Sequence, residues 1–151
     1  MKKKVLFLCI GNSCRSQMAE GFARRYASDL LDVCSAGLSP ASIVQPLTVD
    51  VMAEKSIKID QQYPKDLTSL DLSDLDLLIN MSGVTLPKRI PIPTYEWKVE
   101  DPIGCSNEVY RKVRDQIEGL VMGLIIDLRR GSTQHTPAPP RRLALLRRKP
   151  R

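Results

Sequence analysis

The sequence predicts an α/β fold in which helices cover a parallel sheet. Three observations support this prediction. Short apolar runs of strand character alternate with segments in which apolar residues recur every three or four positions. No internal repeat interrupts the alternation, and a length of 151 residues suits one domain. Alternation of this kind is typical of sheets whose parallel strands are joined by helices.

The first strand and the first helix have the clearest signals. Residues 4–9 form a short apolar run, and Gly11-Asn12 ends it with a turn. From Ser16 onward the apolar positions have helical spacing. The apolar face of this helix comprises Met18, Ala19, Phe22, Ala23 and Tyr26. Because parallel sheets bind ligands at the carboxyl ends of their strands, Cys9 is a candidate site residue.

The remaining elements follow from shorter signals. Pro46 suits the first turn of a helix, and Ser106 is a good N-cap for a long final helix. Residues 85–102 are rich in proline and predict mostly loop. The predicted elements are strands at residues 32–36 and 76–81, a short strand at residues 94–97, and helices at residues 46–55 and from Ser106 to about residue 130.

The excess positive charge of the chain lies at its end. Residues 131–151 hold six basic side chains and no acidic one. Subtracting these six from the 23 lysines and arginines leaves 17, which equals the number of aspartates and glutamates. The body of the chain is therefore neutral, and nucleic acid is not expected as a partner.

We therefore expect a catalytic domain at residues 1–130 and a basic Pro/Arg-rich tail at residues 131–151. The prolines of the tail forbid continuing the last helix. Residues 143–146 lie between arginine pairs, as in a short amphipathic turn that touches a membrane. A disordered basic extension is the simpler interpretation, so membrane contact by the tail is not expected.

The cysteine content favours an intracellular protein. Four cysteines are few for a disulfide scaffold, and none belongs to a Cys-x-x-Cys pair. The single histidine is His135, so neither a zinc site nor another cofactor is expected. Neither a signal peptide nor an apolar run long enough for a membrane helix is present. These features predict a cytoplasmic protein with reduced thiols.

The strand-to-helix junction at residues 9–16 has the composition of an anion-binding loop. The backbone N–H groups of such a loop point inward, and the following helix adds the positive end of its dipole. Gly11 and Asn12 tolerate the left-handed conformation. Arg15 offers a planar fork to two oxygens of a tetrahedral anion. The oxyanion-binding residues that we expect are Ile10, Gly11, Asn12, Ser13, Cys14 and Arg15.

The same loop is expected to activate Cys9. A thiol surrounded by N–H donors, beside a guanidinium and a helix N-terminus, loses its proton well below its free pKa of roughly 8.5. Ser16 can donate a hydroxyl hydrogen bond to the sulfur. The sequence thus predicts a thiolate nucleophile that faces the central atom of a bound oxyanion.

The segment at residues 5–21, VLFLCIGNSCRSQMAEG, resembles the signature of the low-molecular-weight protein tyrosine phosphatase superfamily, which includes the thioredoxin-coupled arsenate reductases. The likeness extends through residues 35–37 and the Asp101-Pro102 pair to the last helix. It implies a three-layer α/β/α fold with a four-stranded parallel sheet and helices on both faces. Residues 131–151 have no counterpart in it.

The resemblance also implies roles for single residues. Asp101 matches the general acid that the family carries before a proline on a mobile loop. Asn12 and Ser35 match the residues that support the anion loop. In the arsenate reductases a potassium ion lies nearby, and the residues that resemble its ligands are Asn12, Glu20, Ser35 and Asp66.

Within this superfamily the sequence points in two directions. The residues after the Asp-Pro pair are not aromatic, which is closer to the reductases than to the tyrosine phosphatases. The reductases, however, carry further thiols after the third strand, and residues 80–86 contain no cysteine. Because hydrolysis needs only Cys9, Arg15 and Asp101, we expect a phosphomonoester hydrolase that forms a phosphocysteine intermediate. Its ligands would be phosphate, arsenate or a phosphorylated substrate.

Two other functions stay open. An arsenate reductase would take its resolving thiol from Cys14, from Cys105 or from an external reductant. A non-catalytic sensor would bind an oxyanion in the same loop without turning it over. Tyr95 and Trp97 either form a pocket wall or pack beneath the acid loop. The simplest interpretation of Cys34 is a buried strand residue.

Overall fold

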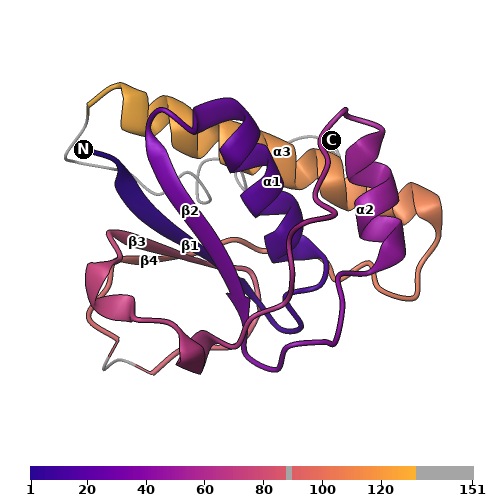
Figure 1. Ribbon diagram of the computed structural model, residues 1–151, viewed down its shortest axis with the longest axis horizontal. Coiled ribbons are helices and arrows are strands. Elements are labelled where there is room, and N and C mark those ends of the chain that lie inside the picture. Colours follow the sequence, from indigo (N-terminus) through magenta and orange to yellow (C-terminus); the bar gives the residue numbers. More distant parts are fainter. Residues whose placement is uncertain (88–89, 132–151) are drawn as a thin grey trace, which may run out of the picture.

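The structure is a computed structural model, and it describes residues 1–87 and 90–131. Strands and helices alternate as predicted (Figure 1). In chain order the elements are β1 (Lys3–Cys9), α1 (Arg15–Ala27), β2 (Leu31–Gly37), α2 (Pro46–Ala53), the short 3-10 turns η1 (Leu67–Ser69) and η2 (Leu72–Asp74), β3 (Leu77–Asn80), β4 (Thr94–Glu96) and α3 (Asn107–Arg129).

The four strands form one parallel sheet in the order β2-β1-β3-β4. In the centre, Val5 of β1 pairs with Val33 of β2 on one side and with Leu77 of β3 on the other. The expected four-stranded parallel sheet is thus confirmed. Its carboxyl edge holds Cys9 in register with Gly37 of β2, and this edge carries the site described below.

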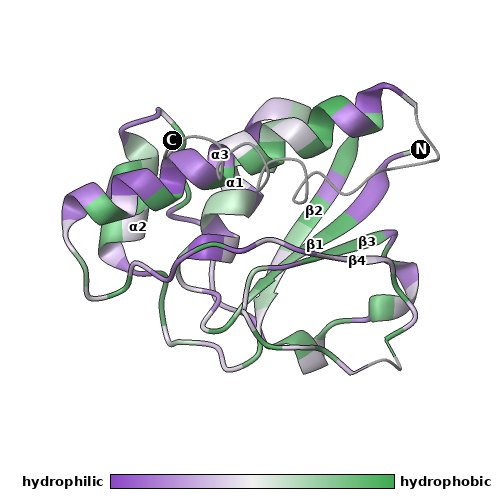
Figure 2. Cartoon of the chain, turned by 180° about the vertical axis from the view of Figure 1, so that it is seen from behind, coloured by the Kyte–Doolittle hydropathy of each residue, from purple (hydrophilic) through white to green (hydrophobic). Residues whose placement is uncertain are grey.

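Both faces of the sheet are covered, which explains the unbroken apolar run of β1. Val5 and Phe7 pack into the cluster that α1 and α3 complete. Leu6 and Leu8 belong to a second cluster, on which the apolar residues of η1 and η2 pack. Figure 2 shows this pattern as mostly green strands between helices that are purple on part of their surface. Helices on both faces, as the resemblance implied, are therefore confirmed.

The final helix begins and ends at the predicted signals. The hydroxyl of Ser106 accepts a hydrogen bond from the N–H of Val109 at 3.4 Å, as an N-cap does. Gly131 adopts a left-handed conformation (φ 65°) directly after α3, a common helix ending. The predicted tail, apart from Gly131, lies outside the described residues.

The 3-10 turns η1 and η2 were not expected from the sequence. The carboxylates of Asp66 and Asp71 cap them by accepting from the N–H groups of Thr68 and Ser73. Such short capped turns leave no periodic pattern. In the described part of the chain no helix offers an apolar stretch that could span a bilayer.

Candidate active site

The loop between β1 and α1 turns its carbonyl groups outward. The carbonyl oxygens of residues 9–13 each accept a hydrogen bond from outside the loop. The donors are the backbone N–H groups of Leu38, Ser39, Ala41 and Gln45 and the side-chain amide of Gln17. The N–H groups of residues 10–14 have no acceptor among the described residues. The loop therefore presents a concave row of free N–H donors where α1 begins, an arrangement that suits an anion.

Two residues make this tight turn sterically possible. Asn12 has a φ of 49°, a left-handed conformation that this residue type tolerates. Gly37, at the end of β2, lies directly against the loop. A Cβ atom there would sit 2.5 Å from the carbonyl oxygen of Ile10 and 2.9 Å from the backbone nitrogen of Asn12. A side chain at position 37 would displace the loop.

The thiol of Cys9 lies at the base of the loop, beside Ser16. Its sulfur is 2.8 Å from the hydroxyl oxygen of Ser16. That oxygen already accepts a hydrogen bond of 2.7 Å from the side-chain amide of Asn12. The hydroxyl proton of Ser16 is therefore free to point at the sulfur. Both residues are buried, so water does not weaken this interaction.

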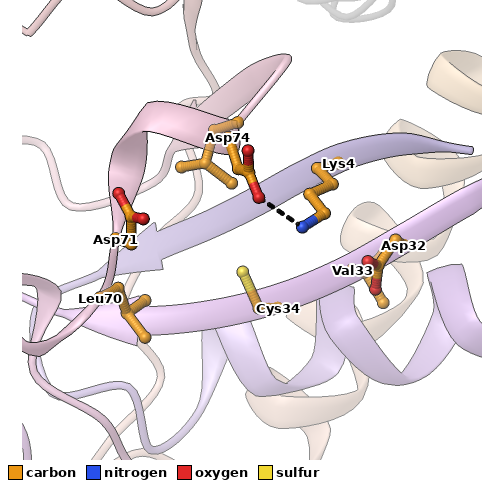
Figure 3. Close-up of a pocket in the computed structure, with 8 residues that line it drawn as sticks. Lys4, Asp32, Val33, Cys34, Leu70, Asp71 and Asp74 are labelled. Atoms are coloured by element: carbon orange, nitrogen blue, oxygen red, sulfur yellow. Dashed lines mark hydrogen bonds and ion pairs between the residues drawn. The ribbon is translucent and has the colours of Figure 1, made fainter.

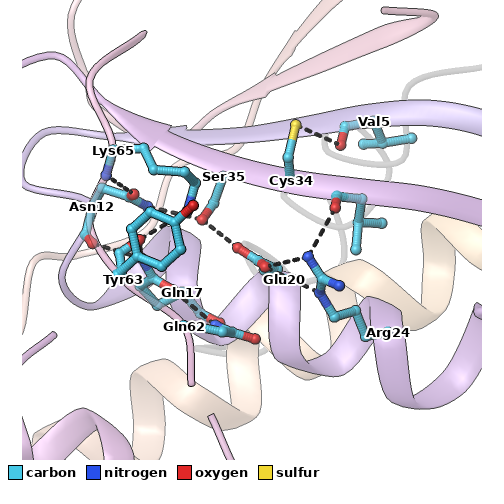
Figure 4. Close-up of polar contacts among 11 residues, drawn as sticks. Val5, Asn12, Gln17, Glu20, Arg24, Cys34, Ser35, Gln62, Tyr63 and Lys65 are labelled. Atoms are coloured by element: carbon cyan, nitrogen blue, oxygen red, sulfur yellow. Dashed lines mark hydrogen bonds and ion pairs between the residues drawn. The ribbon is translucent and has the colours of Figure 1, made fainter. Parts of the chain in front are cut away.

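A buried chain of polar side chains fixes the loop from behind (Figure 4). The amide of Asn12 also donates to Ser35, 3.0 Å away, and Ser35 donates to the carboxylate of Glu20. The amide oxygen of Asn12 accepts from the backbone N–H of Lys65 at 2.8 Å. This series of hydrogen bonds runs from the Glu20 carboxylate to the Cys9 sulfur. The network brings together the two loop-supporting residues that the sequence proposed.

The structure joins three of the four potassium-ligand candidates by hydrogen bonds. Asn12, Glu20 and Ser35 are joined by the hydrogen bonds above, whereas the Asp66 side chain makes a local capping contact. Its Oδ1 accepts from the N–H and the hydroxyl of Thr68 at 2.9 and 2.8 Å, because Asp66 caps η1. The place of Asp66 in this set stays a prediction.

The Glu20 carboxylate forms an ion pair with Arg24. Arg24 donates to its Oε2 from Nη2 at 2.6 Å and from Nε at 3.0 Å. The ammonium of Lys65 donates to the carbonyl of Tyr63 at 2.8 Å (Figure 4). Burial lowers the pKa of Lys65, and the Glu20 charge acts in the opposite direction. The positive charge near Glu20 is thus supplied by the protein itself.

Arg15 and Asp101 face each other across the mouth of the loop. One guanidinium nitrogen of Arg15 donates to the carbonyl oxygens of Met81 at 2.7 Å and Val99 at 3.1 Å. Its other terminal nitrogen, Nη2, is 3.7 Å from a carboxylate oxygen of Asp101. The Arg15 side chain is 7 % exposed, whereas that of Asp101 is 48 % exposed. Arg15 is therefore held by the segments that follow β3 and β4, and Asp101 has access to water.

The other three cysteines differ in accessibility. Cys14 is buried in the anion loop, and Cys105 is exposed on the turn that follows Asp101. Cys34 lies in β2 beside a cavity of about 290 Å³ (Figure 3), which the ion pair between Lys4 and Asp74 borders. Burial raises the pKa of Cys34. This cavity lies away from the carboxyl edge of the sheet and brings no group toward Cys9.

Cys14 is expected to resist alkylation in the folded protein. Burial raises the pKa of its thiol to about 12. Because that is four units above pH 8, only about one Cys14 side chain in 10⁴ is ionised at that pH. Iodoacetamide at pH 8, followed by peptide mass spectrometry, should modify Cys105 and leave Cys14 unmodified. After denaturation both should react, and equal rates in the folded protein would contradict the prediction.

A cleft of about 490 Å³ opens beside the anion loop and reaches Arg15. Its wall is the extended segment that continues β4, in which exposed charged side chains alternate with buried apolar ones. Trp97 is buried and packs on Phe7 with ring centroids 6.0 Å apart. Glu96 and Lys98 point to solvent. Trp97 is thus both packing and pocket wall, the two possibilities that the sequence left open.

Comparison with known proteins identifies the family. A profile described as low molecular weight phosphotyrosine protein phosphatase matches residues 4–134. The chain belongs to this family. The glutaredoxin arsenate reductase of Synechocystis sp. is 41 % identical over 82 % of this chain and 96 % of its own. A solved structure of an arsenate reductase in the phosphate-binding state has 39 % identity and a TM-score of 0.77, and the match covers 82 % of this chain and 97 % of that one.

The sequence analysis placed a phosphomonoester hydrolase first, and the comparisons show that this ranking was wrong. Among the solved structures, the low-molecular-weight protein tyrosine phosphatase from T. tengcongensis is 30 % identical, over 82 % of this chain and 98 % of its own, with a TM-score of 0.71. The arsenate reductases match at about 40 % identity over the same extent. The hydrolase was preferred because residues 80–86 lack cysteine. That absence limits the source of a resolving thiol and does not remove the first step of arsenate reduction.

The sequence missed several partners that hold the site, most of them far along the chain. Gln17, the carbonyl groups that hold Arg15, and Lys65 all contribute to the site. Their contacts span 5 to 84 positions, and no local pattern marks them. The charged wall of the cleft was missed because residues 85–102 were interpreted mainly as loop. Only the alternation of charged and apolar residues from Glu96 onward carried a signal.

Proposed function

We propose that this protein is an arsenate reductase in which the Cys9 thiolate attacks arsenate bound in the loop at residues 10–15. The observation that carries the proposal is the position of the Cys9 sulfur, 2.8 Å from the Ser16 hydroxyl and beneath a row of free N–H groups. The identity to arsenate reductases supports arsenate as the oxyanion. Phosphate, which has the same shape and charge, should occupy the loop as a competitor.

The first step forms a bond between sulfur and arsenic. Backbone N–H groups and Arg15 bind the arsenate oxygens and stabilise the charge that develops on them. The thiolate of Cys9 attacks arsenic, and one arsenic–oxygen bond breaks. Asp101, opposite Arg15 and exposed to water, donates a proton to the departing oxygen, which leaves as water. The product is a covalent adduct of Cys9 with pentavalent arsenic.

The second step needs another thiolate. When it attacks the Cys9 sulfur, a sulfur–sulfur bond forms and the sulfur–arsenic bond breaks. The electron pair of the broken bond stays on arsenic, which leaves as arsenite in the trivalent state. The two sulfur atoms together supply the two electrons. A further thiol then reduces the disulfide and restores Cys9.

Asp101→Asn should lower the rate of arsenate reduction roughly 10²–10⁴-fold, because an amide cannot donate the proton that the leaving oxygen needs. The KM for arsenate should change little. The measurement is kcat from arsenate-dependent oxidation of the reductant. Glu108→Gln, which removes an exposed carboxylate on α3, is the matched control and should retain the full rate. A normal kcat in Asp101→Asn would exclude the acid role.

A paired assay tests the proposed function. The purified protein is supplied either with arsenate and a thiol reductant or with an aryl phosphate. We expect reductant oxidation that depends on arsenate and is inhibited competitively by phosphate. Aryl phosphate turnover without any arsenate-dependent oxidation would overturn the proposal. We also propose that residues 1–130 carry this activity, since every proposed site residue lies within them.

A further inference from the structure

We propose that Thr48, in the first turn of α2, is a positioning residue that turns the backbone N–H of Cys14 toward the bound oxyanion. Thr48 acts through one peptide unit, which joins Ser13 to Cys14. The inference rests on the proposed function and deepens it, because it names a side chain outside the anion loop that prepares one of the donors of the loop. Thr48 is not proposed to contact the anion.

The carbonyl oxygen of Ser13 accepts two hydrogen bonds from the beginning of α2. The backbone N–H of Gln45, the N-cap residue, donates at 2.9 Å, and the hydroxyl of Thr48 donates at 3.2 Å. The N–H of Thr48 in turn donates to the carbonyl of Gln45 at 2.9 Å, so both donors belong to one helical turn. Ser13, Cys14 and Thr48 are buried, so water does not compete for these contacts.

A planar trans peptide converts a fixed carbonyl group into a fixed N–H group. The two groups point in opposite directions, and the peptide between Ser13 and Cys14 is trans. Because two donors hold the Ser13 carbonyl toward α2, the N–H of Cys14 points the other way, into the concave row of donors. Among the described residues that N–H has no acceptor. Hydrogen bonds to the carbonyl also polarise the peptide and make its N–H a stronger donor.

Thr48 is the donor to the loop that a substitution can remove most cleanly. The carbonyls earlier in the loop accept from backbone N–H groups of the segment after β2, which a side-chain change leaves in place. Side chains donate to the last two carbonyls, Gln17 to Asn12 and Thr48 to Ser13. Gln17 also donates to the carbonyl of Tyr63, so its removal would disturb a second segment.

The rest of α2 holds Thr48 in place. Val51 and Met52 are buried in the core of the protein. The carbonyl of Val51 accepts a hydrogen bond of 3.0 Å from the guanidinium of Arg114 in α3. Arg114 also pairs at 2.7 Å with Glu54, directly after α2. Because α2 is tied to α3 in this way, its first turn is a fixed support for the loop.

Thr48 also lies beside the thiol of Cys14, which offers a second route for its influence. Burial raises the pKa of that thiol to about 12, and a hydrogen bond to Thr48 acts in the opposite direction. A thiol with this pKa is protonated near neutral pH and can donate to the Thr48 oxygen, which leaves the hydroxyl proton for the Ser13 carbonyl. The two routes are separable, because only the second needs the Cys14 side chain.

Calorimetric titration of the full-length protein with inorganic phosphate tests the inference. Thr48→Val keeps the shape of the side chain but removes the hydroxyl. It should raise the Kd for phosphate about three- to tenfold, the value of one hydrogen bond, and lower kcat/KM for arsenate by the same factor. Thr48→Ser should bind phosphate within about twofold of the unaltered protein, whereas Thr48→Ala should resemble Thr48→Val. The serine and alanine variants keep the test available if the valine variant does not fold.

Val51→Ala is the matched control. It changes a buried residue of the same helix and removes no donor to the loop. The variant should lower the Tm of the protein and leave the Kd for phosphate unchanged, because the cost of lost packing falls on folding.

The amide proton of Cys14 gives a local readout in NMR spectra. Phosphate should move its resonance downfield in the unaltered protein and less far in Thr48→Val. The N–H of Gly11 is the internal control, because the carbonyl of its peptide, that of Ile10, is held by Ser39. Its shift should be the same in both proteins. The weaker binding of phosphate should also persist when Thr48→Val is combined with Cys14→Ala, since the peptide route does not use the thiol.

The possible failures are distinguishable. If Thr48→Val and Thr48→Ala bind phosphate as tightly as the unaltered protein, or if Thr48→Ser binds it as weakly as Thr48→Ala, the positioning role is wrong and the reductase proposal stands. Loss of the effect in the Cys14→Ala background would assign it to the thiol and equally overturn the inference. If the unaltered protein does not bind phosphate, both proposals fail.

Discussion

Cys9→Ser should abolish arsenate reduction, with a loss of at least about 10⁴-fold in kcat. A hydroxyl has a far higher pKa than a thiol and cannot form the sulfur–arsenic adduct or pass electrons to arsenic. Anion binding should survive, because the donors of the loop are backbone N–H groups and Arg15. We expect phosphate to bind with unchanged or tighter affinity, since removal of the thiolate removes a negative charge next to the anion.

Arsenite formation and calorimetric titration with phosphate together check this prediction. Cys34→Ser is the matched control, because Cys34 lies in β2 and takes no part in the site. It should retain activity within about twofold, as expected for a change away from the chemistry. Arsenite formation by Cys9→Ser at more than a few per cent of the normal rate would rule out Cys9 as the nucleophile.

Arg15→Lys should lower kcat/KM for arsenate about 10²–10³-fold and weaken phosphate binding, although the charge is kept. The guanidinium of Arg15 donates to two backbone carbonyls while its Nη2 faces the mouth of the loop. A single ammonium cannot hold both carbonyls and still offer a planar fork to the anion. The rigid position of the charge is therefore lost.

Steady-state kinetics and phosphate titration measure this effect. Arg25→Lys, at an exposed arginine of α1 whose guanidinium donates to the carbonyl of Ser56, serves as the control and should behave normally. Equal phosphate affinity in Arg15→Lys and the unaltered protein would show that Arg15 does not bind the anion.

The fold and the core of the site were predictable because their signals are local. The bounds of β1 and α1 follow from an apolar run, a Gly-Asn turn and helical spacing within some 25 residues. The left-handed Asn12 and the contact between Cys9 and Ser16 also follow from one short segment. Such features depend on backbone sterics and on a single strand-to-helix junction, which sequence patterns record directly.

The parts that escaped prediction depend on contacts between distant segments. Arg15 is held by Met81 and Val99, which follow it by 66 and 84 positions. Short sequence motifs also could not decide between hydrolysis and reduction, because that choice depends on where the second thiol comes from.

The fate of arsenic tests the central claim most directly. The purified protein is incubated with arsenate and excess glutathione, and both arsenite and oxidised thiol are quantified over time, with Cys9→Ser in parallel. A reductase produces one arsenite for every two thiols consumed, in many turnovers per protein molecule and only when Cys9 is present. Thiol oxidation without arsenite, or arsenite formed equally by Cys9→Ser, would contradict it.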